Sequence, residues 1–272
     1  IPSVTNENIE RVYPMLYPPR TSKEKIYETI ISDLTSAVPY LSSSNKGEFK
    51  ATKGAAYALL AKVYATEGAK TLRDYNKVVT YCDNVLSEGY RLVDDYESLW
   101  LPDNKFTTES IFEVLYTIEA PNWAYWVLLK EADGTVTWRR YCTPTHELLN
   151  KYEKNDLRKT SSFIWTSVPY DVYYPANNYP LAYKIREKNS DIIIMRLADI
   201  ILLKAEALVE LNTVPEAIDL TNQIRKRAGL TDLDRTISQS AARLAVEKER
   251  QLELVLEGQR WFDLVRNERM VD

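Results

Sequence analysis

The sequence predicts a mainly α-helical protein, built from tetratricopeptide-like helical hairpins in an α-α superhelix with a loop-rich, aromatic-rich insert. Six segments repeat apolar residues at helical spacing. Two pairs of these segments share one layout: a helix rich in Ala and Leu, a short link, and a second helix that ends at Gly. This layout is typical of tetratricopeptide-type repeats, although the strict repeat period is not kept. Between the two pairs, Trp and Tyr concentrate in a region where helical periodicity fades.

The first predicted helix covers residues 22–38. Thr21 or Ser22 can cap its amino end, because a side-chain oxygen there accepts a hydrogen bond from a backbone N–H of the first turn. Apolar residues then line one face, and Pro39 ends the helix.

Two helical hairpins and one further helix follow. The first hairpin joins helices at 51–68 and 74–88, and the second joins helices at 195–211 and 215–228. Neighbouring helices with such short connections read as αα-hairpins. We expect both hairpins to pack in one layered array, followed by a helix at 239–257.

Residues 118–185 hold four of the six Trp and eight of the nineteen Tyr. Helical periodicity is short there apart from THELLNKYEKND, and strands are expected only near 111–117 and 181–186. Sugar rings present flat C–H faces that pack on Trp and Tyr, and sugar hydroxyls need planar donors and acceptors. The side chains that we therefore expect to contact a sugar are Trp123, Tyr125, Trp126, Trp138, Arg139, Tyr141, Trp165, Tyr173 and Asn177. The alternative is that these rings cover a small core of the insert itself.

We expect at least two of the four Trp in this region to be exposed in or beside a shallow groove, with Arg139 or Asn177 close by. Ring stacking tolerates many sugars, so the sequence does not name the glycan.

Composition excludes several classes of protein. An apolar content of 45% and a charged content of 27% are typical of a globular chain. The net charge of −4 argues against nucleic acid as the main partner. Cys82 and Cys142 cannot form a disulfide framework or a metal site alone, so we expect two buried free thiols. No apolar run approaches the roughly 18 residues that cross a bilayer.

No catalytic motif is present. GxSxG, GxxxxGK[ST], GxGxxG and HExxH are all missing from the sequence. The single His146 is interpreted as a residue at a helix start. The loop carboxylates Glu119, Glu131, Asp133 and Asp171 have no spacing that marks a glycosidase pair. We therefore predict no catalytic residue, no cofactor and no metal site.

The stretch ERQLELVLEGQRWFDLVR, residues 249–266, predicts a structural cluster. Three glutamates fall on one helical face, and Arg250, Arg260 and Arg266 are spaced to pair with them or to cap carbonyl groups. A Gly then allows the helix to end, and we expect Trp261 to be buried just past it, so that Trp261→Ala would cost about 3–5 kcal/mol. The residues assigned to this cluster are Glu249, Arg250, Glu253, Glu257, Gly258, Arg260, Trp261 and Asp263.

The same stretch resembles the C-terminal signature of the SusD/RagB family, the glycan-binding outer-membrane lipoproteins of Bacteroidetes. Further segments resemble family blocks in family order, and together they cover most of residues 21–266. They are ATKGAAYALLAKVY, YCDNVLSEGYRLVDDYESLW, ESIFEVLY, THELLNKYEKNDLRK, DIIIMRLADIILLKAEAL and IRKRAGL.

This resemblance implies a single SusD-like helical domain over residues 1–272. Within it we expect a first helical block at 21–117, the loop-rich insert at 118–185 and a second helical block at 191–266. The resemblance implies non-catalytic capture of oligosaccharide at the outer-membrane surface, for delivery to a SusC-like TonB-dependent transporter.

The family's signal peptide, lipidated Cys and N-terminal helical region have no match here, so contact with the membrane is expected only through a lipid anchor that this chain does not contain. Two other functions stay open. A helical-repeat scaffold that binds protein partners is one, and a glycosidase without a recognised motif is the other.

Overall fold

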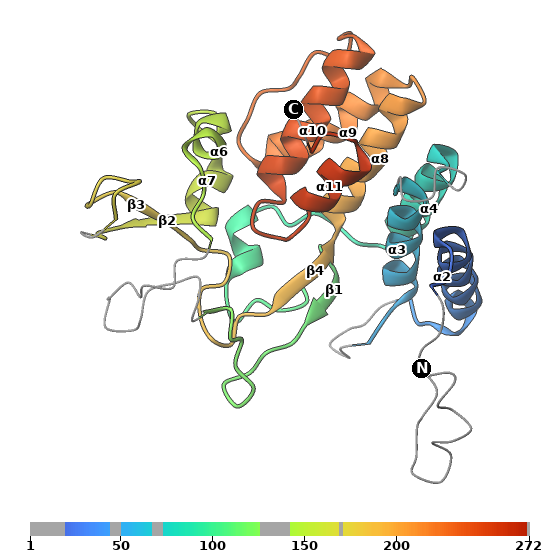
Figure 1. Ribbon diagram of the computed structural model, residues 1–272, viewed down its shortest axis with the longest axis horizontal. Helices are drawn as coiled ribbons and strands as arrows, with labels where there is room; N and C mark the ends of the chain where they lie inside the picture. The colour runs from blue at the N-terminus through green and yellow to red at the C-terminus, as the bar shows by residue number, and fades with distance from the viewer. Residues whose placement is uncertain (1–19, 44–49, 67–72, 126–141, 169–170, 271–272) are drawn as a thin grey trace.

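The computed structural model describes residues 20–43, 50–66, 73–125, 142–168 and 171–270 (Figure 1). Its α-helices are, in chain order, α2 (Lys23–Ala37), α3 (Lys53–Ala65), α4 (Tyr75–Ser87), α6 (His146–Lys151), α7 (Leu157–Ser162), α8 (Leu197–Glu210), α9 (Val214–Arg227), α10 (Gln239–Glu253) and α11 (Arg260–Arg266). Its 3-10 helices are η2 (Val38–Tyr40) and η4 (Tyr96–Trp100). Its strands are β1 (Ser110–Val114), β2 (Phe163–Thr166), β3 (Tyr179–Ala182) and β4 (Ile192–Arg196).

The predicted mainly helical class is confirmed. The six helices expected from periodicity are α2, α3, α4, α8, α9 and α10, and the two expected strand regions overlap β1 and β3. The expectation that strands occur only there was wrong, because β2 and β4 pair with these two strands, and β4 takes the first two residues of the helix expected at 195–211. Strands form two small antiparallel sheets, β1 with β4 and β2 with β3. Of the two predicted caps of the first helix, Ser22 is the one used, since its hydroxyl accepts from the Lys25 N–H. Asp74 caps α4 by accepting from two of its N–H groups.

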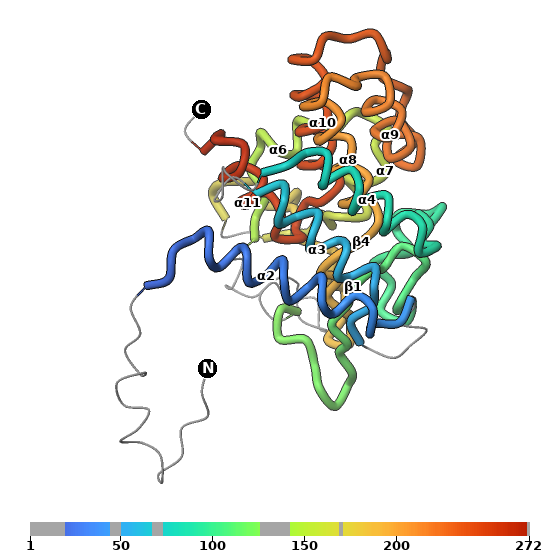
Figure 2. The backbone as a smooth tube through the Cα atoms, turned by 90° about the vertical axis from the view of Figure 1, so that its right-hand side faces the viewer, coloured from blue at the N-terminus to red at the C-terminus, as the bar shows by residue number. Residues whose placement is uncertain are grey.

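The two predicted hairpins pack in one array, as expected. Helices α3, α4 and α8 lie in successive layers, and α9 and α10 continue the array beyond α8 (Figure 2). Thirteen of the fourteen residues of α8 are buried, so this helix is enclosed on every side. Ala58 and Ala61 of α3 are fully buried in the same core, where their small side chains allow a close approach between helices.

The insert contributes a second, smaller core. Leu149, Phe163 and Leu181 come from α6, β2 and β3, and they pack with Leu252 and Val255 at the end of α10. This core fixes the two short strands to the helical array, so the loop between them is held on a rigid support (Figure 1).

Glu253 is the centre of a buried ion-pair network. Its carboxylate pairs with Arg158 at 3.1 Å, with Arg196 at 2.6 Å and with Arg227. Burial alone would raise the pKa of Glu253, but the charges of Arg227, Arg196 and Arg158 hold that pKa well below its ordinary value. The prediction that at least one glutamate of this face pairs with an arginine is therefore confirmed.

The predicted ion pairs of these glutamates with Arg250, Arg260 and Arg266 were wrong, although Arg250 donates to the Asp199 carbonyl oxygen at 3.0 Å, as the alternative of carbonyl capping allows. Arg250 pairs with Asp199 and Asp263, Arg260 with Glu247, and Arg266 with Glu206 and Asp263. The glutamate face of α10 points toward arginines of α7, β4 and α9, whereas the arginines close in sequence lie on other faces of the helices.

The predicted burial of Trp261 was also wrong, because its side chain is 61% exposed. Asp263 and Arg266 of α11 are buried. Asp263 forms an ion pair with Arg250, and Arg266 forms one with Glu206. These two positions are three residues apart and define the inner face of the short helix, so Trp261 and the neighbouring Phe262 point outward.

Replacement of Trp261 by Ala is accordingly expected to lower the free energy of unfolding by less than about 1 kcal/mol, because exposed substitutions rarely cost more. Leu252→Ala is the matched comparison, since Leu252 is 1% exposed and its truncation should cost about 2–5 kcal/mol. Urea unfolding of both variants measures the difference. Equal losses would show that Trp261 is covered in solution.

The expectation for the cysteines is half right. Cys82 is buried and free, whereas Cys142 is free but exposed, because it lies in the segment before α6 and outside the apolar clusters. None of the helices within the described ranges has the length and apolar character needed to span a membrane.

Candidate functional site

The loop between β2 and β3 is shaped by Asp171. The Asp171 Oδ1 atom accepts hydrogen bonds from the backbone N–H of Tyr173 at 2.8 Å and of Tyr174 at 3.0 Å. An Asp side chain bonded to the backbone two and three residues ahead stabilises a turn. The turn places two consecutive tyrosines on opposite sides of the backbone, one inward and one outward.

Tyr174 is the inward ring and anchors the loop. It is 7% exposed, its hydroxyl donates to the Pro144 carbonyl at 2.7 Å, and its ring meets Tyr179 edge-on at 5.7 Å. Burial raises the pKa of Tyr174, so its hydroxyl stays protonated and remains a donor. Tyr174 and Tyr179 both belong to the buried core of the insert.

Tyr173 is the outward ring and is 53% exposed. The His146 ring lies 4.5 Å from the Tyr173 ring and 4.3 Å from the Tyr174 ring. His146 Nε2 also contacts the Tyr173 carbonyl oxygen at 3.0 Å. Tyr173 is therefore exposed to solvent while His146 and the Asp171 turn hold it in position. A ring that is exposed and held in this way is suited to stacking on a ligand.

Trp123 is a second presented ring, 74% exposed, in the turn after β1. The preceding Asn122 is buried and fixes that turn, because its Nδ2 donates to the Ser190 carbonyl at 2.9 Å and its Oδ1 accepts from the Ala124 N–H at 2.9 Å. Tyr125 is half-buried at the end of the same turn, where its N–H donates to the Asn122 carbonyl.

The remaining expected sugar contacts fall into two groups. Trp165 is half-buried against the core of the insert, whereas Asn177 is exposed in the same loop as Tyr173. Those that lie outside the described residues are Trp126, Trp138, Arg139 and Tyr141. Two of the four Trp expected at a groove lie in the described residues. Trp123 is exposed, whereas Trp165 packs against the core of the insert.

His146 is the residue of this cluster that sequence reasoning missed. It is the first residue of α6, after the Thr145 cap, as its interpretation as a helix-start residue requires. Its contact with Tyr173 arises from tertiary packing, and no local pattern indicates it. Among the described residues, no group of three or more metal-ligating side chains gathers at one place.

The sequence and the fold are similar to those of known proteins. The SusD family model matches residues 158–272, which include α7 to α11 and the Glu253 network. SusD-like protein P2 of Formosa agariphila is 25% identical over 291 aligned positions, covering 91% of this chain and 57% of the relative. A SusD superfamily protein of Parabacteroides distasonis superposes with a TM-score of 0.74 at 28% identity, covering 89% of this chain and 58% of that one. Residues 158–272 thus match the SusD family, and most of the chain is similar to SusD-like proteins in sequence and fold.

One SusD relative has a ligand in its name. A laminarin-binding SusD-like protein superposes with a TM-score of 0.71 at 25% identity, covering 90% of this chain and 61% of that one. The chain spans somewhat over half the length of the relatives it matches. Both exposed rings, Tyr173 and Trp123, lie on turns that are fixed by hydrogen bonds of Asp171 and Asn122.

Proposed function

We propose that the chain binds oligosaccharide without turning it over, through exposed rings of the insert at residues 118–185. The observation that carries the proposal is the outward Tyr173 ring, fixed by His146 and by the Asp171 turn. The relationship to a laminarin-binding SusD-like protein supports a carbohydrate as the ligand. The helical blocks at 21–117 and 191–266 would serve as the support.

The geometry suits a sugar more than a metal ion or a charged cofactor. The half-exposed Tyr173 ring is held by His146, so it can stack on the C–H face of a pyranose without changing its conformation. Little conformational entropy of the side chain is therefore lost on binding. Asn177 is exposed in the same loop and offers both a donor and an acceptor to sugar hydroxyls. The Asp171 carboxylate lies at the base of the same loop.

We further propose that the protein works at the outer-membrane surface, held by a lipid anchor, and passes its ligand to a SusC-like TonB-dependent transporter. The support for location and partner is the match of residues 158–272 to the SusD family.

Replacement of Tyr173 by Ala is expected to weaken glycan binding by about 1–3 kcal/mol, roughly 5- to 150-fold, by analogy with the stacking of bases on aromatic side chains. Isothermal titration calorimetry with laminarin, amylopectin, xylan and galactomannan oligosaccharides measures it. Tyr40→Ala is the matched control, because Tyr40 is 91% exposed on η2, in the first helical block.

Three results would contradict the proposal. Binding that is equal in Tyr173→Ala and wild type would exclude this ring from the site. A loss that is equal in Tyr40→Ala would mean that the effect is not specific to the insert. Release of free sugar from the same oligosaccharides would show catalysis in place of simple binding.

A further inference from the structure

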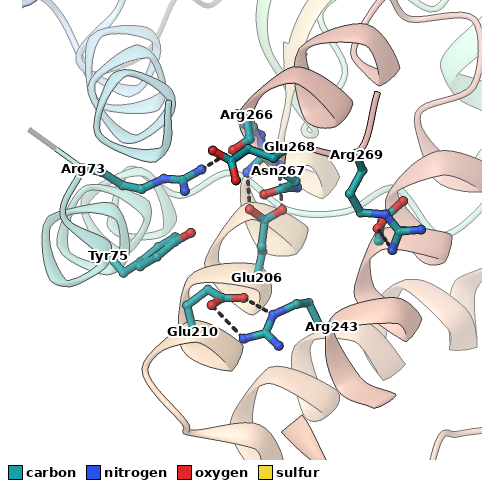
Figure 3. Close-up of a pocket in the computed structure, with 10 residues that line it drawn as sticks. Arg73, Tyr75, Glu206, Glu210, Arg243, Arg266, Asn267, Glu268 and Arg269 are labelled. Carbon is teal, nitrogen blue, oxygen red and sulfur yellow. Dashed lines mark hydrogen bonds and ion pairs between the residues drawn. The ribbon is translucent and has the colours of Figure 1, made fainter. Parts of the chain in front are cut away.

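A polar cleft lies on the helical array, between α4 on one side and α8, α10 and the end of α11 on the other (Figure 3). It has a volume of about 270 Å³. Its lining residues come from segments far apart in the sequence, and those that carry the inference are Arg73, Tyr75, Glu210, Arg243, Arg266 and Asn267.

A separate hollow of about 370 Å³ lies next to the cleft, and Arg73 and Tyr75 line both spaces. The Arg73 guanidinium is fixed there, because it donates to the carbonyl oxygens of Ala65 and Arg266 and lies 5.5 Å from the Tyr75 ring centre. The volume of the cleft alone is close to the lower end of the range of small-molecule sites, roughly 300–1,000 Å³.

Arg243 and Arg266 are already paired with carboxylates of the cleft, whereas among the described residues Arg73 donates to backbone carbonyl oxygens only. Arg243 donates from Nε and Nη2 to the two carboxylate oxygens of Glu210, at 2.5 and 2.8 Å. Arg266 likewise donates from Nη1 and Nη2 to the two carboxylate oxygens of Glu206 (Figure 3). Binding an anion at Arg243 or Arg266, or a cation at Glu206 or Glu210, would break a bidentate ion pair, so a charged ligand is disfavoured there.

Two neutral groups remain available. Within the described part of the chain, neither the Tyr75 hydroxyl nor the Asn267 side-chain amide makes a hydrogen bond. Burial raises the pKa of Tyr75, ahead of the opposing charge of Arg73, so the hydroxyl stays protonated and both donates and accepts. The amide of Asn267 likewise offers both functions, and so does the hydroxyl group of a sugar.

We propose that this cleft is a second saccharide-binding site, separate from the insert, which takes a neutral pyranose unit. The Tyr75 hydroxyl and the Asn267 amide bind sugar hydroxyls, and the Tyr75 ring supplies the apolar face. This inference rests on the proposed function, since it extends carbohydrate binding to a second surface. A peptide ligand fits less well, because the residues that line the cleft are almost all charged or polar and offer no apolar pocket for side chains.

The two sites lie on different parts of the molecule. The loop between β2 and β3 projects at one side of the array, and α4 lies at the other (Figure 1). A polysaccharide long enough to reach both sites would bind more tightly than its fragments, because the second contact forms within an existing complex. Short oligosaccharides would occupy the two sites independently.

The test uses calorimetry of the whole chain with hexasaccharides of laminarin, amylose, xylan and mannan. For the glycan that binds, wild type is expected to take two molecules per chain. The Tyr75→Phe/Asn267→Ala variant removes the two available groups without disturbing an ion pair, and it should lose the second binding event or weaken it about 10-fold. Tyr57→Phe is the control, because it removes a half-buried hydroxyl of α3 outside the cleft. Thermal melting confirms that each variant is folded.

Each result decides one of the two sites. Both sites are supported if wild type shows two binding events and if Tyr173→Ala and the cleft variant each remove one of them. Unchanged binding in the cleft variant overturns the second site and leaves the proposed function standing. Loss in the cleft variant alone supports the cleft and overturns the role of Tyr173. No binding of any of the four hexasaccharides by wild type overturns both.

Discussion

Replacement of Glu253 by Ala is expected to lower the free energy of unfolding by about 3–5 kcal/mol, since removal of one partner leaves buried charges uncompensated. Glu253 is fully buried, and its carboxylate contacts Arg158, Arg196 and Arg227. These arginines belong to α7, β4 and α9, so one carboxylate links three elements to α10. Without it, three buried guanidiniums must share the carboxylates that remain.

Urea unfolding measures this loss, and an exposed ion pair supplies the control. Arg235 and Asp219 pair at 2.7 Å with both side chains about half exposed, so Asp219→Ala should cost less than about 1 kcal/mol. A loss below 1 kcal/mol in Glu253→Ala would show that the network contributes to orientation only. In that event the arginines would have found water or other partners.

The helices could be predicted because their signals are local. The side chain of Ser22 begins α2 by capping, and the apolar periodicity of the six helical segments identified them without any tertiary information. The facing of α11 could not be predicted in this way. In so short a helix the buried side is selected by distant partners, here Glu206 for Arg266 and Arg250 for Asp263, and Trp261 is turned outward as a result.

The sequence indicates the aromatic-rich region that contains the candidate site. It does not indicate which contacts hold each ring there. The concentration of Trp and Tyr is visible in the composition of residues 118–185. Which of the consecutive Tyr173 and Tyr174 faces solvent depends on the Pro144 carbonyl and the Tyr179 ring, which tertiary structure brings to the loop. The outward position of Tyr173 agrees with its choice as a sugar contact, but binding itself stays a prediction.

The second cleft had no signal in the sequence at all. Tyr75 begins α4 and Asn267 follows α11, so their meeting depends on the packing of α4 against α8 and of α11 against α8. Neither residue lies in an aromatic cluster or a charged motif of the sequence. Such a site becomes visible only when the hydrogen-bond and ion-pair partners of its neighbours are known in space, which leaves the Tyr75 hydroxyl and the Asn267 amide available.

Acid is expected to unfold the protein steeply, through carboxylates whose folded pKa values are depressed. In Glu253 and Asp199, burial alone would raise the pKa, but Arg227 and Lys62 lead the groups of charges that lower it instead. Asp263 is lowered in the same way by Arg250 and Arg266. Their ordinary values, 4.5 for Glu and 3.8 for Asp, apply in the unfolded chain.

The sign of the effect follows from proton uptake. Below about pH 4.5 the unfolded chain binds protons at these three carboxyls while the folded chain does not, so protons stabilise the unfolded state. The stabilisation is therefore complete above about pH 5 and is lost as the pH falls, at up to about 1.4 kcal/mol per pH unit for each group. Urea unfolding between pH 7 and pH 3 measures that slope, and Glu253→Gln, which cannot titrate at this position, should show a shallower one. A slope that is equal in Glu253→Gln and wild type would mean that the pKa of Glu253 in the folded chain is close to its ordinary value, and its ion pairs would then contribute little to acid sensitivity.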